Sequence, residues 1–408
     1  MISRTTILRY KGSTKSLPEI AKELRADAVV EASVQRVGDH VRINANLIQA
    51  STDATLWSKE FDREISDVLR LEADVASEIG QGIQARITPE ETRRLSNAKS
   101  VMPMALEEYL LGQLYFRNGD YGPAVSHYEQ ATRQQPDYAA AYGMLSMALH
   151  LGEAFGATTR AQVETKGRAA ALKALQLDPE QAEAHLAMAG IVWFEDWDWA
   201  GAEQFFKRAL ELNPGSAEIC GCRLFFLTTT GRAPEAIAFG QASLQRDPLS
   251  DFVELLYGHA LYFARRYEEG AVHLQRALEL NPQNLLARQF LSDVYSQSGK
   301  LPEARTLLDR PEFRNSATFA AVNARLGRRD EALRILEALG KDAPDSYGNA
   351  LAYFALGDQE RGFEWLARAI DRRQLFVSQA LFDPAMPDSV RSQPRFQELM
   401  AKLKLPAR

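Results

Sequence analysis

Cysteine is scarce in this chain of 408 residues, which contains Cys220 and Cys222 and no others. Because the two lie one residue apart on an expected helix, their side chains point in different directions and we predict no disulfide between them. Neither has a histidine neighbour, which favours structural packing over metal binding. We therefore expect no disulfide framework, no metal site and no cofactor.

The sequence also lacks long hydrophobic runs and basic clusters. Without a stretch of about 18 apolar residues we expect no membrane span. Without a basic-then-apolar leader we expect a cytoplasmic location, or a periplasmic one if a membrane anchor precedes the chain. The net charge is −6, and the lack of a Lys- or Arg-rich run argues against direct contact with nucleic acid. These features leave the oligomeric state open.

Motifs that carry catalysis are missing as well. No glycine-rich phosphate loop occurs, and the six histidines are scattered. His150 and Glu153 have a spacing that can share a metal ion, but no third ligand lies near them in sequence, so a polar helix end is the preferred interpretation. Trp197 and Trp199 fall in an expected turn, where we predict half-exposed rings that could contact a ligand. The sequence predicts no catalytic residue and no enzyme; an enzyme built on these tryptophans and nearby acids is the least favoured alternative.

The chain has a repeat instead. Prolines recur at positions 136, 179, 214, 248 and 282, which are 43, 35, 34 and 34 residues apart. Each proline ends a similar sequence segment, and the segment Ala-Leu-Glu-Leu-Asn-Pro ends at both Pro214 and Pro282. A period near 34 residues is typical of helical pairs that stack into a solenoid, because one pair cannot bury its apolar face alone.

Positions between the prolines repeat too. Large apolar residues, such as Trp193 and Leu261, recur at one position of the first helix. Small residues facing large ones at helical spacing favour ridges packed into grooves. A small residue stands five before each proline, namely Ala131, Ala174, Ala209, Ser243 and Ala277. The turn between the two helices contains a glycine, which can adopt the left-handed conformation that ends a helix; these are Gly119, Gly231 and Gly299.

These motifs resemble the tetratricopeptide repeat. The resemblance implies a mostly α fold, with an α-solenoid of about eight helical hairpins over residues 101–376 and a helical tail over 377–408. Residues 1–100, which lack this period, are expected to form a separate small α/β domain. Arrays of this kind usually bind other proteins on their concave face.

Two repeats depart from the pattern. The second contains about nine extra residues within Leu151–Gln162, either as a loop on the binding face or as a longer turn that the solenoid merely tolerates. The fourth has Arg223-Leu224, beside the two cysteines, where a small packing pair is expected. We predict looser packing there.

Before residue 101 the period changes to that of strands. Ala28–Arg36, the alternating segment Val41–Leu47 and Leu56–Glu60 are predicted strands. A turn is expected at Val37-Gly38-Asp39. Helices are expected at Leu17–Leu24, with Pro18 in its first turn, at Asp67–Ile87, and from Thr88, and a linker at Ser96–Pro103.

A second resemblance covers this region. The segments Ile2-Ser3-Arg4-Thr5, Leu17–Leu24, Ala28–Val34 and Val41–Trp57 are similar to the TolB-like amino-terminal α/β domain, without its first strand and helix. In bacteria this domain precedes tetratricopeptide arrays and usually follows a winged-helix, protein kinase or nucleotide cyclase module. The segment Phe382–Met400 resembles the tail that commonly ends such arrays.

The first helix of each pair is expected to line the concave face. An apolar, aromatic groove there would suit a protein or peptide segment, either in trans or from the chain's own Arg391–Arg408. We predict a non-enzymatic scaffold or sensor of a bacterial signalling system. The alternative is the regulatory part of a transcription regulator or nucleotide cyclase whose output domain is absent from this chain. The predicted groove residues are Tyr109, Phe116, Ile191, Phe194, Phe225, Phe252, Leu255, His259 and Tyr262.

Overall fold

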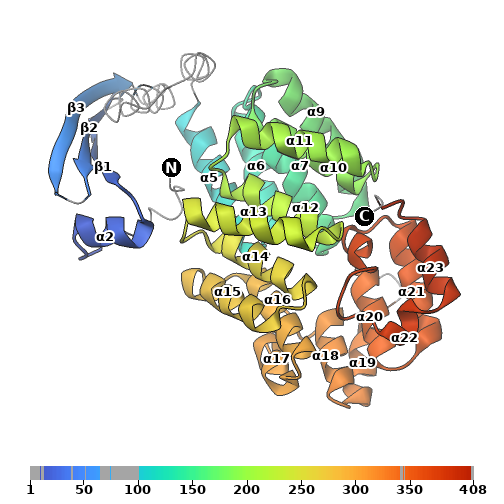
Figure 1. The fold of residues 1–408 in the computed structure, drawn as a ribbon. Helices are drawn as coiled ribbons and strands as arrows, with labels where there is room; N and C mark the ends of the chain where they lie inside the picture. Colours follow the sequence, from blue (N-terminus) through green and yellow to red (C-terminus); the bar gives the residue numbers. More distant parts are fainter. Residues whose placement is uncertain are drawn as a thin grey trace. The chain divides into compact units, whose positions relative to one another are not determined.

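The computed structural model describes residues 10, 13–37, 40–50, 52–64, 74, 101–340, 343 and 345–405 (Figure 1). The contacts divide the chain into two compact units. One comprises Leu111–Glu129 and Ala139–Arg408, and the other comprises Ile2–Leu110 and Gln130–Tyr138. Among the helices of the described residues, none has the length and hydropathy that a membrane crossing requires.

Helix α2 (Leu17–Leu24) forms as the sequence predicts. The backbone N–H of Ser16 donates to the Glu19 carboxylate at 2.8 Å, which satisfies one of the amides that a helix start leaves without a partner. Pro18 lies in the first turn, where its missing N–H costs no helical hydrogen bond.

The three predicted strands are confirmed as one antiparallel sheet in the order β1-β2-β3. Val41, Ala45 and Phe61 form its buried cluster, and the third strand is longer than predicted. The bounds are β1 (Ala28–Val37), β2 (His40–Gln49) and β3 (Ala54–Glu64). Gly38 and Asp39 of the predicted turn, and the predicted helices between Asp67 and the linker, lie outside the described residues apart from Asp74.

From Pro103 onward the chain forms helices that pack as neighbours in sequence (Figure 1). This mostly helical solenoid is the predicted fold class. The pairs are α5 (Pro103–Asn118) with α6 (Tyr121–Gln134), α7 (Ala139–Ala154) with α9 (Arg168–Leu177), α10 (Ala182–Phe194) with α11 (Trp199–Leu212), α12 (Ala217–Thr229) with α13 (Ala233–Arg246), α14 (Asp251–Phe263) with α15 (Tyr267–Leu280), α16 (Leu285–Gln297) with α17 (Leu301–Leu308), α18 (Ala317–Arg325) with α19 (Arg329–Leu339), and α20 (Ser346–Ala355) with α21 (Gln359–Asp371).

The C-terminal segment follows the last pair. Its elements are the 3-10 helix η3 (Leu375–Gln379), α22 (Asp388–Arg391) and α23 (Pro394–Ala401). Phe396, Leu399 and Leu403 share a buried cluster with Phe363 and Leu366 of α21. This cluster holds the end of the chain against the last helical pair.

The predicted packing positions lie where helices touch. Ala209 and Ala277 are fully buried. A Cβ atom on Gly258 would lie 2.7 Å from Leu274 of the partner helix, so a side chain at this position would force the two helices apart. Gly231, at the turn between α12 and α13, has φ of +80°, a left-handed conformation that favours glycine.

Ala209→Trp tests this register. Because Ala209 is fully buried, the larger ring should overpack the site and cost about 1–3 kcal/mol. The matched control is Ala242→Trp on α13, where the alanine is exposed and the ring can remain in solvent. Thermal unfolding should show a lower melting temperature for the first variant alone. Equal melting temperatures for the two variants would show that Ala209 does not lie where two helices pack together.

The extra residues of the second repeat extend helical structure rather than forming a long loop. After α7 the chain turns through Phe155–Thr159 and enters α8 (Arg160–Gln162) and a π-helical turn, η2 (Val163–Gly167), before α9. Thr158 Oγ1 donates to the Leu149 carbonyl at 2.8 Å, which fastens the turn to α7.

The two helices of the fourth repeat, α12 and α13, contact each other less extensively than the helices of the third and fifth repeats do, in agreement with the looser packing predicted there. Cys222 and Leu224 are buried, and the Phe252 ring occupies the space that a side chain on Gly221 would need. The Arg223 guanidinium extends to Glu203 of α11, with which it forms an ion pair. The arginine is therefore accommodated by an acidic partner on the preceding pair.

The first pair of the array contacts the fifth and sixth pairs. The Asn281 side-chain amide donates to Asn118 Oδ1 at 2.7 Å, and that of Asn284 donates to the Arg117 carbonyl at 3.2 Å. The Phe116 ring lies 6.3 Å from Phe252. Helices far apart in sequence thus enclose the inner face of the array, which is the surface formed by the first helices of the pairs.

Candidate functional site

The predicted groove residues lie inside the protein. Each of the nine has at most 7% of its surface exposed, and Tyr109 packs against the Tyr138 ring at 5.1 Å. These nine residues therefore do not form an open, solvent-facing aromatic stripe, because neighbouring helices and the C-terminal segment cover their side chains. Their role in binding a partner stays a prediction.

The segment Leu375–Asp383 covers the inner face. The Phe376 ring lies 5.1 Å from Phe155 and 5.7 Å from Phe225, edge-on to both. The Tyr262 hydroxyl donates to Asp383 at 3.0 Å. The covering residues therefore begin upstream of Arg391–Arg408, the tail considered from sequence, and Phe155 of the second repeat contributes to the contact.

Asp383 anchors this segment. Its carboxylate accepts hydrogen bonds from the hydroxyls of Tyr262 and Tyr347, the latter at 2.8 Å, and from the Ala385 backbone N–H at 2.9 Å. Burial raises the pKa of Asp383, although these hydrogen bonds oppose the shift. Arg391 holds the same turn by donating to the Leu381 carbonyl at 2.6 Å.

A cavity of about 380 Å³ remains between the inner helices and this segment. Helices α14, α16, α18 and α20 contribute to its walls, together with the C-terminal segment. Phe263, Phe290 and Phe376 supply aromatic surface, and Asp293 and Gln379 supply polar groups. A cavity of this size and lining is typical of small-molecule sites.

His259 stands in the wall of the cavity. Its ring stacks on Phe290 with the centroids 4.1 Å apart, and its Nδ1 has no hydrogen-bond partner within the described residues. Burial lowers the pKa of His259 to about 3, so the ring is neutral at neutral pH.

Trp199 is buried, so the prediction that it is half exposed is wrong. Its indole N–H donates to the Leu403 carbonyl at 3.3 Å, because the C-terminal segment lies over this turn. Trp197 is partly buried, and the Arg373 guanidinium lies 5.2 Å from its ring centre. Trp193 is buried against Phe226, as its packing position predicts.

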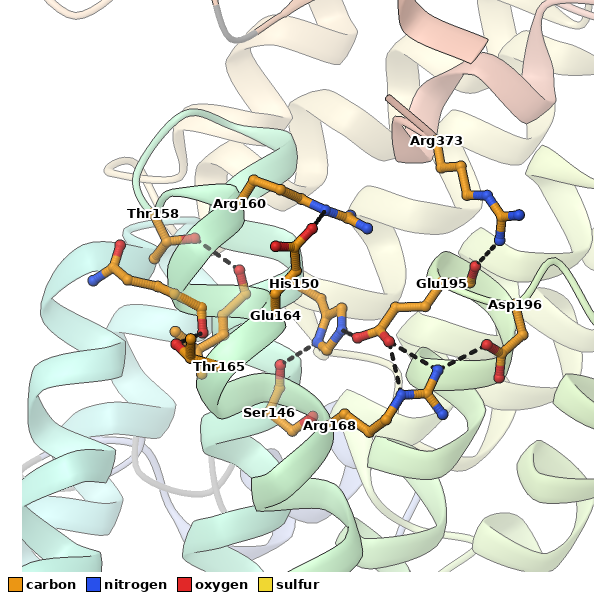
Figure 2. A network of polar contacts seen from close by, with 12 residues as sticks. Ser146, His150, Thr158, Arg160, Glu164, Thr165, Arg168, Glu195, Asp196 and Arg373 are labelled. Carbon is orange, nitrogen blue, oxygen red and sulfur yellow. Dashed lines mark hydrogen bonds and ion pairs between the residues drawn. The ribbon is translucent and has the colours of Figure 1, made fainter. Parts of the chain in front are cut away.

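A polar network joins the second and third repeats to the C-terminal segment (Figure 2). His150 Nδ1 lies 2.7 Å from the Ser146 carbonyl and Nε2 lies 2.8 Å from Glu195, which also accepts from Arg168 Nε at 2.9 Å. Arg373 donates to the Glu195 carbonyl. Burial alone would raise the pKa of Glu195, but the hydrogen bonds from His150 and Arg168 lower it. His150 is thus used in structure, and the described residues contain no group of three side chains suited to a metal ion.

Comparisons with known proteins agree with the repeat. Models of the tetratricopeptide repeat match residues 109–157 and 261–315, so the chain contains tetratricopeptide repeats. The structure of PilF from Pseudomonas aeruginosa is 22% identical, with a TM-score of 0.38, and covers 52% of this chain and 95% of its own. The structure of the human IFIT1 dimer with m7Gppp-AAAA is 15% identical, with a TM-score of 0.47, and covers 74% and 80%.

One curated relative has a name that mentions an activity. The "Putative adenylate cyclase 3" of Rhizobium meliloti (strain 1021) is 28% identical over 207 residues. The match covers 49% of this chain and 35% of the relative. This chain therefore matches about a third of the length of that protein.

Proposed function

We propose that this chain is a non-catalytic interaction and sensor module of a bacterial regulatory system, and that its inner face binds a polypeptide segment of a partner. The observation that carries the proposal is the seating of Leu375–Asp383, which places Phe376 between Phe155 and Phe225. A face that already accepts one polypeptide segment has the aromatic surface and the hydrogen-bonding groups to accept another. The partner segment would take the place of the chain's own.

A second candidate is the regulatory part of a nucleotide cyclase. The similarity to the Rhizobium meliloti protein favours it, as does the likeness of the N-terminal segments to a TolB-like domain. Reading the coding DNA upstream of Met1 distinguishes the candidates, because an in-frame cyclase domain supports the second one. The cytoplasmic location expected from the sequence belongs to both.

Replacing Phe376 with alanine tests the first candidate. Losing the ring weakens the contact of the chain's own segment without altering the helices beneath it, so a partner should compete more successfully. Affinity purification from the native host should then recover a set of proteins in larger amounts with Phe376→Ala than with wild type. Truncating Phe225 or Phe252 would instead test folding, since both are buried.

The matched control is Phe239→Ala on α13. Phe239 is partly buried, as Phe376 is, but it belongs to the second helix of its pair. This variant should recover the same amounts as wild type. If all three proteins recover identical partners in equal amounts, the inner face is not the binding surface.

A further inference from the structure

Two side chains that line the cavity beneath the C-terminal segment have an oxygen atom that the fold leaves without a hydrogen bond. Asn349 and Gln379 both line it and are more than nine-tenths buried. Within the ranges that the structure describes, Asn349 Oδ1 and Gln379 Oε1 have no hydrogen-bond partner. Asn349 uses its amide group, which donates to the Asp345 carbonyl at 2.6 Å. Buried acceptors without a donor are costly, and a bound molecule that donates hydrogen bonds would satisfy them once either side chain turns its oxygen toward the cavity.

The charges around the cavity are mostly negative. The cavity is lined by four acidic residues, namely Asp293, Glu312, Asp345 and Asp383. Among the described lining residues, the basic side chains are those of His259 and Arg325. Asp383 and Asp345 accept hydrogen bonds within the protein. Asp293 makes no hydrogen bond or ion pair to any described residue, so its carboxyl group is available to a ligand.

The remaining wall is aromatic. Phe155, Phe263, Phe290 and Phe376 line the cavity with Tyr262. Ring faces attract a cation most strongly where water is excluded, and they also pack against the apolar part of an organic ligand. A metal ion fits this lining poorly, since no three acidic, histidine or cysteine side chains in the described part of the chain are grouped to hold one.

We propose that this cavity binds an organic ammonium ion, with Asp293 as its counter-ion, the oxygens of Asn349 and Gln379 as hydrogen-bond acceptors, and the aromatic rings around its apolar part. The proposal rests on the sensor role of the proposed function and gives it a ligand class. Since Phe376 and Gln379 belong to the covering segment, a ligand in the cavity contacts that segment directly. It would therefore stabilise the closed inner face against displacement by a partner.

Proton release should accompany binding. Burial raises the pKa of Asp293, and nearby Asp383 adds to the shift, while Arg325 opposes it. In the empty cavity the carboxyl group therefore keeps its proton to a higher pH than an exposed aspartic acid does, and an ammonium ion beside it favours the ionised form. We therefore expect the proton that leaves Asp293 to be released to the solution when the ligand binds.

Calorimetry with phenethylammonium chloride on the full chain tests the proposal. The dissociation constant of phenethylammonium should be lower than that of the neutral analogue 2-phenylethanol by a factor of about ten or more, in line with the strength of a charge-assisted hydrogen bond. The anionic analogue 3-phenylpropanoate should not bind. Titrations in two buffers of different ionisation enthalpy should reveal the released proton. If phenethylammonium does not bind, or if the alcohol binds as tightly, the proposal is overturned.

Two variants separate the site from general electrostatics. Asp293→Asn should fold with a melting temperature near that of wild type, because the amide has the size and shape of the carboxyl group, yet bind phenethylammonium about tenfold more weakly and release fewer protons. Glu312→Gln makes the same charge change at an exposed position of the rim and should leave affinity unchanged. Equal losses in both variants, or none in Asp293→Asn, would contradict the assignment.

The outcomes distinguish this proposal from the proposed function. If Phe376→Ala increases partner recovery while phenethylammonium fails to bind, the ligand class is wrong and the interaction role is supported. If the ligand binds as predicted while partner recovery is the same in all variants, the cavity is a ligand site in a protein whose inner face does not bind a partner.

Discussion

Replacing Asp383 with alanine is expected to lower the stability of the C-terminal half of the array by about 3 kcal/mol or more. The substitution leaves the buried hydroxyls of Tyr262 and Tyr347 without their acceptor and removes a partner of the Ala385 N–H. Each buried polar group left without a partner costs about 1–3 kcal/mol. The midpoint of urea unfolding should fall. Hydrogen exchange of the native protein should be faster in Leu375–Gln379 than in wild type.

Two controls define the cause of that loss. Asp388→Ala removes a carboxylate from the same segment, but the Asp388 side chain is 90% exposed, so stability should change by less than about 0.5 kcal/mol. Asp383→Asn keeps an oxygen that accepts hydrogen bonds and should lose much less than the alanine variant. If Asp383→Ala unfolds at the wild-type urea concentration, the carboxylate does not anchor the segment.

Acid should destabilise the wild-type protein through His259. The folded pKa of His259 is lowered to about 3 from 6.5 because the ring is buried. The unfolded chain therefore binds a proton that the folded chain excludes, and the contribution of the neutral ring is complete above about pH 6.5. It falls by about 1.4 kcal/mol for each pH unit below that value, until the folded pKa is reached.

His259→Phe should remove this slope while preserving the stack on Phe290. The comparison with wild type isolates the histidine, because burial raises the pKa of Asp293, Asp345 and Asp383 and these groups affect the two proteins alike. Their stability contribution has the opposite sign and is lost as pH rises. His40→Phe, at an exposed position of β2, is the control. Denaturant midpoints between pH 4 and 7 that decline equally in wild type and His259→Phe would show that His259 does not carry the effect.

The repeat register was predictable because its determinants are local. Ala209 and Ala277 must be small where two helices cross, and Gly231 must adopt a left-handed conformation between them. The same constraints return with every repeat and leave a period in the sequence. The strands were predictable for a similar reason, since the alternation in Val41–Leu47 reflects one buried face.

The closed inner face was not predictable in the same way. Its contacts join residues far apart in the chain, as in the packing of Phe376 on Phe155 and the hydrogen bond from Tyr262 to Asp383. Neither of these two contacts recurs at the period of the repeat, so neither leaves a pattern in the sequence. Trp199 illustrates the consequence, since its position in a turn suggested exposure, whereas the distant Leu403 covers it. The aromatic composition of the inner face was visible in the sequence, and its occupant was not.

Chemical crosslinking between positions 155 and 376 tests the central claim, that the chain's own C-terminal segment closes the inner face. A short bismaleimide reagent should join the two thiols of a Phe155→Cys, Phe376→Cys variant within one chain. It should not join those of a Phe155→Cys, Ser389→Cys variant, in which the second position lies on α22. Cys220 and Cys222 should not interfere, because both are buried and burial raises the pKa of their thiols. An internal crosslink is expected in the first variant alone. Separate modification of both thiols in that variant, with no crosslink, would show that the C-terminal segment does not close the inner face.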